Sequence, residues 1–136
     1  MASILLVEDD DQVRSMLKEL LTRSGHEVSE APGGRRVCDM HQQQRFDLVI
    51  TDLVMPDIEG LAVIMELRRV DQNVRIIAMS GALQGRAKEY LRIAQKLGAQ
   101  LTLVKPFGDQ EFLEAVCLAL ETKAPSDPPV VSKYGE

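Results

Sequence analysis

Five short runs of β-prone residues alternate with five segments of helical periodicity along most of the chain. The expected strands are Ile4–Val7, Glu27–Glu30, Leu48–Thr51, Arg75–Met79 and Leu101–Val104. Four of these runs are almost continuously apolar, as is typical of parallel strands covered on both faces. The second run is short and polar and suits the edge of a sheet. Strict alternation of strands and helices predicts an α/β fold, a doubly wound parallel sheet with right-handed crossovers.

The helical segments differ in how clearly their apolar residues repeat. The clearest stripe is formed by Val13, Met16, Leu17, Leu20 and Leu21. Gly25 is placed to end that helix in a left-handed conformation. Further stripes predict a helix that begins near Gly60, one that is closed by Gly98, and a last one over Phe112–Leu120. The weakest pattern is that of Arg35–Gln43.

Length, composition and charge narrow the class of protein. The 136 residues fit one domain, expected over residues 1–122, with a proline-containing tail or linker over residues 123–136. The net charge of -5 argues against direct binding of nucleic acid, which needs a basic face. Because no apolar run approaches the roughly 18 residues of a membrane span and no signal peptide is visible, we expect a cytoplasmic protein that does not bind membranes.

Histidine and cysteine do not form a metal site in this sequence. His26 and His41 are isolated from each other, and Cys38 and Cys117 lack the spacing of zinc ligands. We expect both cysteines to be reduced thiols in the core.

Polar residues follow the ends of four expected strands. Glu8 and Asp9 follow the first strand, Asp52 the third, Ser80 the fourth and Lys105 the fifth. Each has an ordinary structural explanation by itself, as a helix-terminal acid, a turn residue or a surface lysine. The carboxyl ends of parallel strands nevertheless meet at one edge, where open α/β sheets place their sites. Their convergence therefore predicts a functional site.

The residue types at this edge indicate the chemistry. Carboxylates that lie close together repel one another unless a cation is present, and Mg²⁺ prefers oxygen ligands. The glycine-rich motifs of mononucleotide and dinucleotide sites do not follow the first strand. The sequence thus favours a pocket that handles a phosphoryl group with Mg²⁺.

The motifs at the strand ends resemble those of response-regulator receiver domains. They are Ile4–Asp10, Asp47–Pro56 with Gly60, Ser80–Gly81, Gly98–Ala99 and Lys105–Phe107. The resemblance covers roughly residues 3–122 and implies a flavodoxin-like (βα)5 fold with strand order 2-1-3-4-5. It also implies a signalling domain of a two-component system, which catalyses only its own phosphorylation and dephosphorylation. In this family the peptide bond before Pro106 is commonly cis.

The resemblance gives individual residues their roles. It makes Asp52 the phosphoacceptor, while Lys105 and Ser80 contact the transferred phosphoryl group. It assigns Mg²⁺ ligation to Glu8, Asp9, Asp52 and, through its backbone carbonyl, Val54. Asp10 lies just beyond the acidic pair, so we expect it to cap the following helix.

Two features of the sequence bear on switching and on the lifetime of the phosphoryl group. Many receivers carry Tyr or Phe at the position of Thr102, where the aromatic ring moves together with the residue equivalent to Ser80. Thr102 is small, so an aromatic switch is not expected here. In receivers the positions of Val54 and Ala82 often tune the lifetime of the phosphoryl group. Both residues are apolar here and cannot hold a hydrolytic water, so the resemblance implies a lifetime that is not unusually short.

The resemblance also implies partners. The phosphodonor is a sensor histidine kinase or a histidine phosphotransfer protein, and Arg14, Met16 and Lys18 on the first helix are candidate contacts. A downstream effector or a second copy is expected on the face formed by the fourth helix, the fifth strand and the fifth helix.

Two other functions are compatible with parts of this pattern. A pseudo-receiver would act as a protein-interaction module without phosphorylation, although such domains usually lose some of the five polar site residues kept here. A haloacid-dehalogenase-like phosphatase also uses an aspartyl nucleophile and Mg²⁺. That family places its nucleophile in a DxD motif on the first strand and inserts a cap domain nearby. Here the first strand ends in adjacent acids, and the chain has no room for a cap.

Overall fold

The five expected strands form one parallel sheet in the computed structural model, which describes residues 1–54, 60–81 and 87–121. The strands are β1 (Ser3–Val7), β2 (Glu27–Ala31), β3 (Leu48–Asp52), β4 (Arg75–Gly81) and β5 (Leu101–Lys105). Their order is β2-β1-β3-β4-β5, which confirms the flavodoxin-like topology and the edge position of β2.

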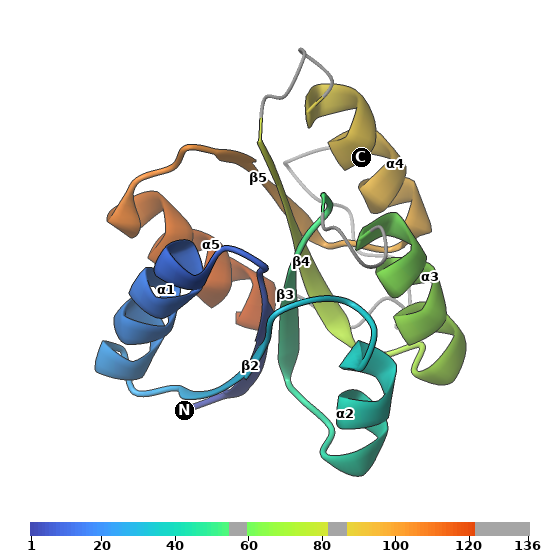
Figure 1. Cartoon of the computed structure of the whole chain (residues 1–136), viewed down its shortest axis with the longest axis horizontal. Coiled ribbons are helices and arrows are strands. Elements are labelled where there is room, and N and C mark those ends of the chain that lie inside the picture. The colour runs from blue at the N-terminus through green and yellow to red at the C-terminus, as the bar shows by residue number, and fades with distance from the viewer. Residues whose placement is uncertain (55–59, 82–86, 122–136) are drawn as a thin grey trace.

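Five helices cover the two faces of the sheet. They are α1 (Asp11–Arg23), α2 (Val37–Gln43), α3 (Gly60–Val70), α4 (Ala87–Leu97) and α5 (Asp109–Glu121). Helices α1 and α5 lie on one face, and α2, α3 and α4 lie on the other (Figure 1). The weakly patterned segment is therefore helical, but its helix begins at Val37, two residues later than expected.

The alternation of side chains along each strand divides the core into two layers. On β1, Leu5 and Val7 pack with the residues of α2, α3 and α4, whereas Ile4 and Leu6 pack with those of α1 and α5. All four side chains are completely buried. A strand with both faces covered has no polar side, which explains why the sequence of β1 is continuously apolar.

The predicted ends of the helices are confirmed. Gly25 and Gly98 adopt positive φ angles of 94° and 119°, a conformation that favours glycine. The carboxylate of Asp10 accepts hydrogen bonds from the backbone N–H groups of Gln12 and Val13 and so caps α1, as expected.

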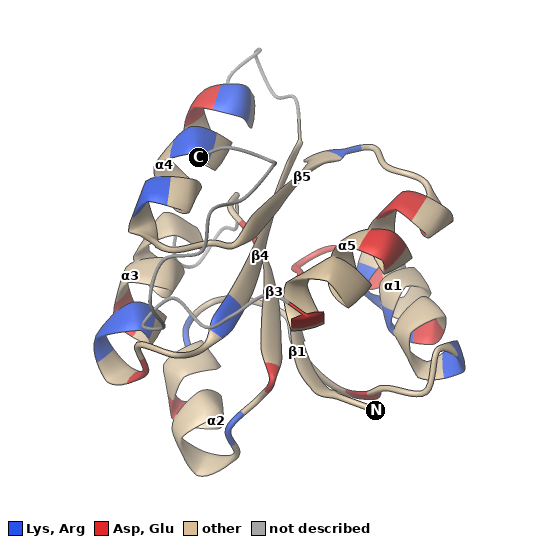
Figure 2. Cartoon of the chain, turned by 180° about the vertical axis from the view of Figure 1, so that it is seen from behind, with Lys and Arg blue, Asp and Glu red and all other residues tan. Residues whose placement is uncertain are grey.

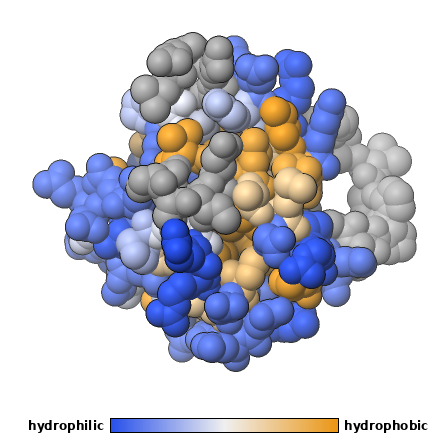
Figure 3. Space-filling view, turned by 45° about the vertical axis from the view of Figure 1, so that its right-hand side comes forward, coloured by the Kyte–Doolittle hydropathy of each residue, from blue (hydrophilic) through white to orange (hydrophobic). Residues whose placement is uncertain are grey.

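Some residues are less buried than the sequence predicts. Cys117 is exposed and Cys38 only half-buried, so the expectation that both are core thiols is wrong. Val104 is 43% exposed because β5 forms the second edge of the sheet. Seen from the side of α2, α3 and α4, hydrophobic residues reach the surface between hydrophilic ones (Figure 3). Met65 on α3 is an exposed apolar residue.

Several expectations fall outside the described residues. The proline-containing tail, Pro56 of the acceptor motif and Ala82 lie there. No helix in the described part of the chain is long and apolar enough to span a bilayer.

A buried polar network ties α2 to the loop between α3 and β4. His41 Nε2 lies 2.7 Å from Asp71 Oδ2, and Arg45 Nη1 lies 3.1 Å from the same oxygen. His41 Nδ1 accepts the N–H of Phe46, so its hydrogen lies on Nε2 and is donated to Asp71. Burial by itself raises the pKa of Asp71. The hydrogen bonds from His41 and the Asn73 N–H, with the charge of Arg45, outweigh burial and lower that pKa.

Asp71→Asn is expected to lower the free energy of unfolding at pH 7 by about 1 kcal/mol, because a charged acceptor contributes more than a neutral one. The lowered pKa makes the carboxylate of Asp71 stabilising above the ordinary aspartate value, near 4, and this contribution is lost as the pH falls through the folded-state value. Urea unfolding of both proteins at pH 7 and pH 3 measures the difference. It should shrink toward zero at pH 3, and a constant difference would show that the charge is not its source.

Candidate functional site

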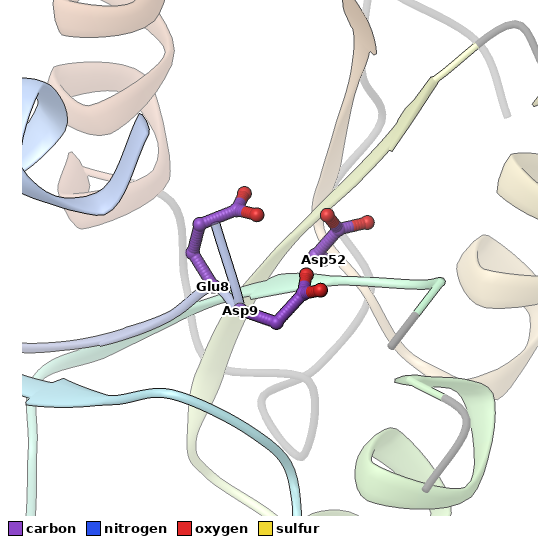
Figure 4. Close-up of side chains that lie close together, drawn as sticks. All are labelled: Glu8, Asp9 and Asp52. Atoms are coloured by element: carbon purple, nitrogen blue, oxygen red, sulfur yellow. The ribbon is translucent and has the colours of Figure 1, made fainter. Parts of the chain in front are cut away.

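Three carboxylates gather at the carboxyl ends of β1 and β3 (Figure 4). Glu8 and Asp9 come from the loop after β1, and Asp52 is the last residue of β3. Each offers a carboxylate oxygen that lies within 4.8 Å of the others. Glu8 and Asp52 are 1% and 5% exposed, whereas Asp9 is open to solvent. We call Glu8, Asp9 and Asp52 the acidic pocket.

Lys105 reaches the acidic pocket from the end of β5. Its Nζ lies 2.7 Å from Glu8 Oε1 and 2.7 Å from Asp52 Oδ2, so one ammonium bridges both buried carboxylates. Burial by itself would lower the pKa of Lys105. Its hydrogen bonds to Asp52 and Glu8 outweigh burial and raise that pKa, so the ammonium stays charged.

The charges of the acidic pocket are only partly balanced. Burial raises the pKa of Glu8, and the neighbouring Asp52 raises it further against the opposing effect of Lys105. The ammonium of Lys105 contacts two of the three carboxylates, and the oxygens present are those that hard divalent cations prefer. The residues of the acidic pocket therefore fit Mg²⁺, which would supply the missing positive charge.

Backbone contacts hold Asp52 in place. The N–H of Val54 donates to Asp52 Oδ1 at 3.1 Å, and the N–H of Leu53 donates to the carbonyl of Met79 on β4 at 2.8 Å. The N–H of Gly60 donates to the carbonyl of Leu53 at 3.0 Å, which places the start of α3 directly beside the end of β3. The carboxylate of Asp52 is thus fixed at the sheet edge before any ligand arrives.

Ser80 lies at the end of β4 and is buried. Its hydroxyl donates to the carbonyl of Gly81, its own neighbour, at 3.2 Å. Thr102 pairs with Ala78 in the β4–β5 register, whereas Ser80 pairs with Val104. Ser80 and Thr102 are therefore two residues apart along neighbouring strands. The Lys105–Pro106 peptide is cis, as the resemblance implies.

Arg14 is a residue whose role at this site the sequence did not indicate. The family resemblance makes it a candidate contact for a partner protein, but its side chain is just 16% exposed. It donates to the carbonyl of Glu8, in the acidic pocket, and pairs with Glu30 on β2. The contact with Glu30 joins residues 16 apart on two elements, and no local sequence pattern signals it.

The chain is similar to proteins of one family. The model of the response regulator receiver domain matches residues 4–117. The chemotaxis protein CheY of Thermotoga maritima is 34% identical over 114 residues, which cover 83% of this chain and 92% of that protein. Sporulation initiation phosphotransferase F of Bacillus subtilis is 29% identical over 123 residues, 89% of this chain and 95% of that protein.

Solved structures agree with these relatives. Chemotaxis protein CheY4 of Vibrio cholerae superposes with a TM-score of 0.79 at 28% identity, covering 88% of this chain and 98% of that one. The response regulator protein TrrA of Thermotoga maritima, solved in complex with Mg²⁺ and BeF, gives a TM-score of 0.76 at 31% identity. That match covers 88% of this chain and 99% of TrrA.

Proposed function

The chain belongs to the response regulator receiver domain family, and on this premise we propose that it accepts a phosphoryl group on Asp52 from a phosphohistidine. Receiver domains of this family are signalling domains of two-component systems. The observation that supports the proposal best is Asp52 itself, a carboxylate 5% exposed at the end of β3 that Lys105 and the Val54 N–H hold at the centre of the acidic pocket.

The proposed reaction moves one phosphoryl group between two proteins. The N–P bond of the phosphohistidine breaks and its electron pair stays with the imidazole nitrogen, while a carboxylate oxygen of Asp52 forms the new O–P bond. The product is an acyl phosphate on Asp52. The chain catalyses only its own phosphorylation and the later loss of this group as inorganic phosphate, and it acts on no separate substrate.

Four groups of this chain would hold Mg²⁺. Three are the side chains of Glu8, Asp9 and Asp52, whose carboxylate oxygens lie close together. The fourth, the backbone carbonyl of Val54, is proposed from the family resemblance. When bound, Mg²⁺ supplies positive charge that offsets the carboxylates and the oxygens of the transferring group. TrrA, the relative solved with Mg²⁺ and BeF, supports this choice of metal.

Lys105 and Ser80 would act on the phosphoryl group itself. The ammonium of Lys105 already touches Asp52, so it can pair with a phosphoryl oxygen after a short movement away from Glu8. Within the described residues, the hydroxyl of Ser80 donates to its neighbour Gly81, and turning it toward the phosphoryl group would pull on the end of β4. Thr102, on the neighbouring strand β5, would then move with the backbone, and no aromatic ring would change its orientation.

The partners are proposed from the family. A sensor histidine kinase or a histidine phosphotransfer protein would dock beside α1, where Met16 is 50% exposed. A downstream effector or a second copy would bind the α4–β5–α5 face, on which Ile93, Val104 and Leu118 are exposed. Helix α4 is mostly basic among its charged residues, with Glu89 as the acidic exception, and the charged residues of α5 are acidic (Figure 2), so two copies could pair opposite charges.

Intact-protein mass spectrometry after incubation with a small-molecule phosphodonor tests the proposed reaction. The chain is expected to gain one phosphoryl group with Mg²⁺ and none when EDTA removes the metal, because the acidic pocket repels the donor without a cation. A folded protein that binds Mg²⁺ but gains no phosphoryl group would contradict the proposal. That result would favour the pseudo-receiver, a protein-interaction module without phosphorylation.

A further inference from the structure

Arg14, in the first turn of α1, folds back toward the acidic pocket. Its Nη1 donates to the backbone carbonyl of Glu8 at 2.8 Å. The rest of the guanidinium is held by two carboxylates, since Nε lies 3.2 Å from Glu30 Oε1 and Nη2 lies 2.6 Å from Asp11 Oδ1. Arg14 is thus committed to contacts within the domain.

The hydrogen bond to the Glu8 carbonyl constrains the orientation of the peptide that joins Glu8 to Asp9. The carbonyl of Glu8 and the N–H of Asp9 belong to one planar peptide, so a bond that fixes the carbonyl also fixes the plane from which Asp9 leaves. The N–H of Glu8 donates to the carbonyl of Ala31 on β2 at 3.1 Å. Glu8 is therefore held on both sides, by β2 and by Arg14.

Asp9 depends on this backbone more than its neighbours do. Lys105 holds the carboxylates of Glu8 and Asp52 directly. Asp9 is exposed and is not among the carboxylates that Lys105 contacts. The place of Asp9 in the acidic pocket is set by the peptide that Arg14 holds.

We propose that Arg14 is a positioning residue, which holds the Glu8–Asp9 peptide against β2 and thereby sets the affinity of the acidic pocket for Mg²⁺. This inference rests on the proposed Mg²⁺ site. Removing a group that orients a metal ligand through a hydrogen bond typically weakens metal affinity about 10–100-fold.

Glu30 on β2, which we call the anchor, holds the side chain of Arg14 in place through an ion pair. Lys18 Nζ lies 2.9 Å from Glu30 Oε2, while Arg14 occupies the other oxygen. The hydrogen bond from Lys18, together with Arg14, lowers the pKa of Glu30, so its carboxylate stays charged at neutral pH. The anchor offers a matched control, since Lys18 shares Glu30 with Arg14 but does not contact the carbonyl of Glu8.

The test compares Arg14→Met with Lys18→Met in the full chain. Titration of the ¹⁵N-labelled proteins with Mg²⁺, followed by the amide shifts of Glu8 and Asp9, gives the dissociation constant. Arg14→Met is expected to raise it about tenfold and Lys18→Met less than about twofold. Arg14→Lys should give an intermediate value, because one ammonium can reach the Glu8 carbonyl or Glu30 but lacks the fork that reaches both.

A second measurement separates positioning from general damage. With saturating Mg²⁺, the rate of phosphoryl uptake from a small-molecule donor is expected to return to within about twofold of wild type in Arg14→Met, as the loss is one of metal affinity. Failure to recover would show structural damage and overturn the inference, as would equal effects of the two Met variants.

The outcomes also separate this inference from the function on which it rests. Unchanged Mg²⁺ affinity in Arg14→Met, in a protein whose wild type binds the metal, overturns the role of Arg14 and leaves the proposed function standing. A wild type that does not bind Mg²⁺ overturns both.

Discussion

Asp52→Asn is expected to give a folded protein that gains no phosphoryl group from a small-molecule donor in the presence of Mg²⁺. An amide oxygen is a poor nucleophile and carries no full charge, so the variant loses the acceptor and one of the three carboxylates of the acidic pocket. Its side-chain oxygen can still accept the N–H of Val54, which keeps the acceptor strand in place. Intact-protein mass spectrometry and circular dichroism measure the two effects.

Asp47→Asn is the matched control for this variant. Asp47 precedes β3 at the opposite end of the same strand, where its carboxylate is exposed and accepts the N–H of Ser3. Asn can make the same bond, so the control should gain its phosphoryl group at the wild-type rate. An adduct that persists in Asp52→Asn would place the acceptor on another residue.

Gly60→Ala is expected to destabilise the chain by about 3 kcal/mol and to lower its melting temperature by roughly 10 °C. A Cβ on Gly60 would lie 2.3 Å from the carbonyl oxygen of Asp52 and 2.5 Å from the Cα of Leu53. Both are backbone atoms and cannot rotate away, so α3 or the acceptor strand must shift. Because that shift displaces Asp52, phosphoryl uptake in the folded fraction should also slow by about tenfold or more.

Gly108→Ala shows what an ordinary glycine substitution does to this chain. Gly108 precedes α5, and a Cβ there would meet nothing within 4 Å, so its effect should stay within about 1 kcal/mol. Thermal and urea unfolding of the two variants give the comparison. Equal stabilities would show that the close approach of Gly60 to Asp52 does not constrain the fold.

The parts of the structure that the sequence predicts well are those that depend on local patterns. Repeats of apolar residues with a period of 2 or 3.6 identify the strands and helices, because each element must carry its own buried face in its local sequence. The ends of the strands follow for the same reason, so the convergence of Asp52, Ser80 and Lys105 could be anticipated before their distances were known. The cap formed by Asp10 is likewise a local hydrogen bond.

The contacts that the sequence does not predict join residues distant in the chain. Arg68 donates to the carbonyl of Val74 at 2.7 Å and to that of Gly98 at 2.8 Å, which links α3 to the end of α4. The pair of His41 and Asp71 spans 30 residues. These contacts depend on individual polar side chains and leave no periodic signal in the sequence. The exposure of Cys117 was missed because its helix is apolar on more than one face.

The bridge from Lys105 to Glu8 spans 97 positions of the chain, so the acidic pocket gains its ammonium only when nearly the whole domain is present. During synthesis, a nascent chain that ends before β5 lacks this ammonium and leaves the carboxylates of Glu8 and Asp52 without their bridge. If Asp52 accepts a phosphoryl group as proposed, such a chain also lacks the residue that would pair with that group. The proposed site is therefore assembled late, when β5 adds to the sheet as its second edge.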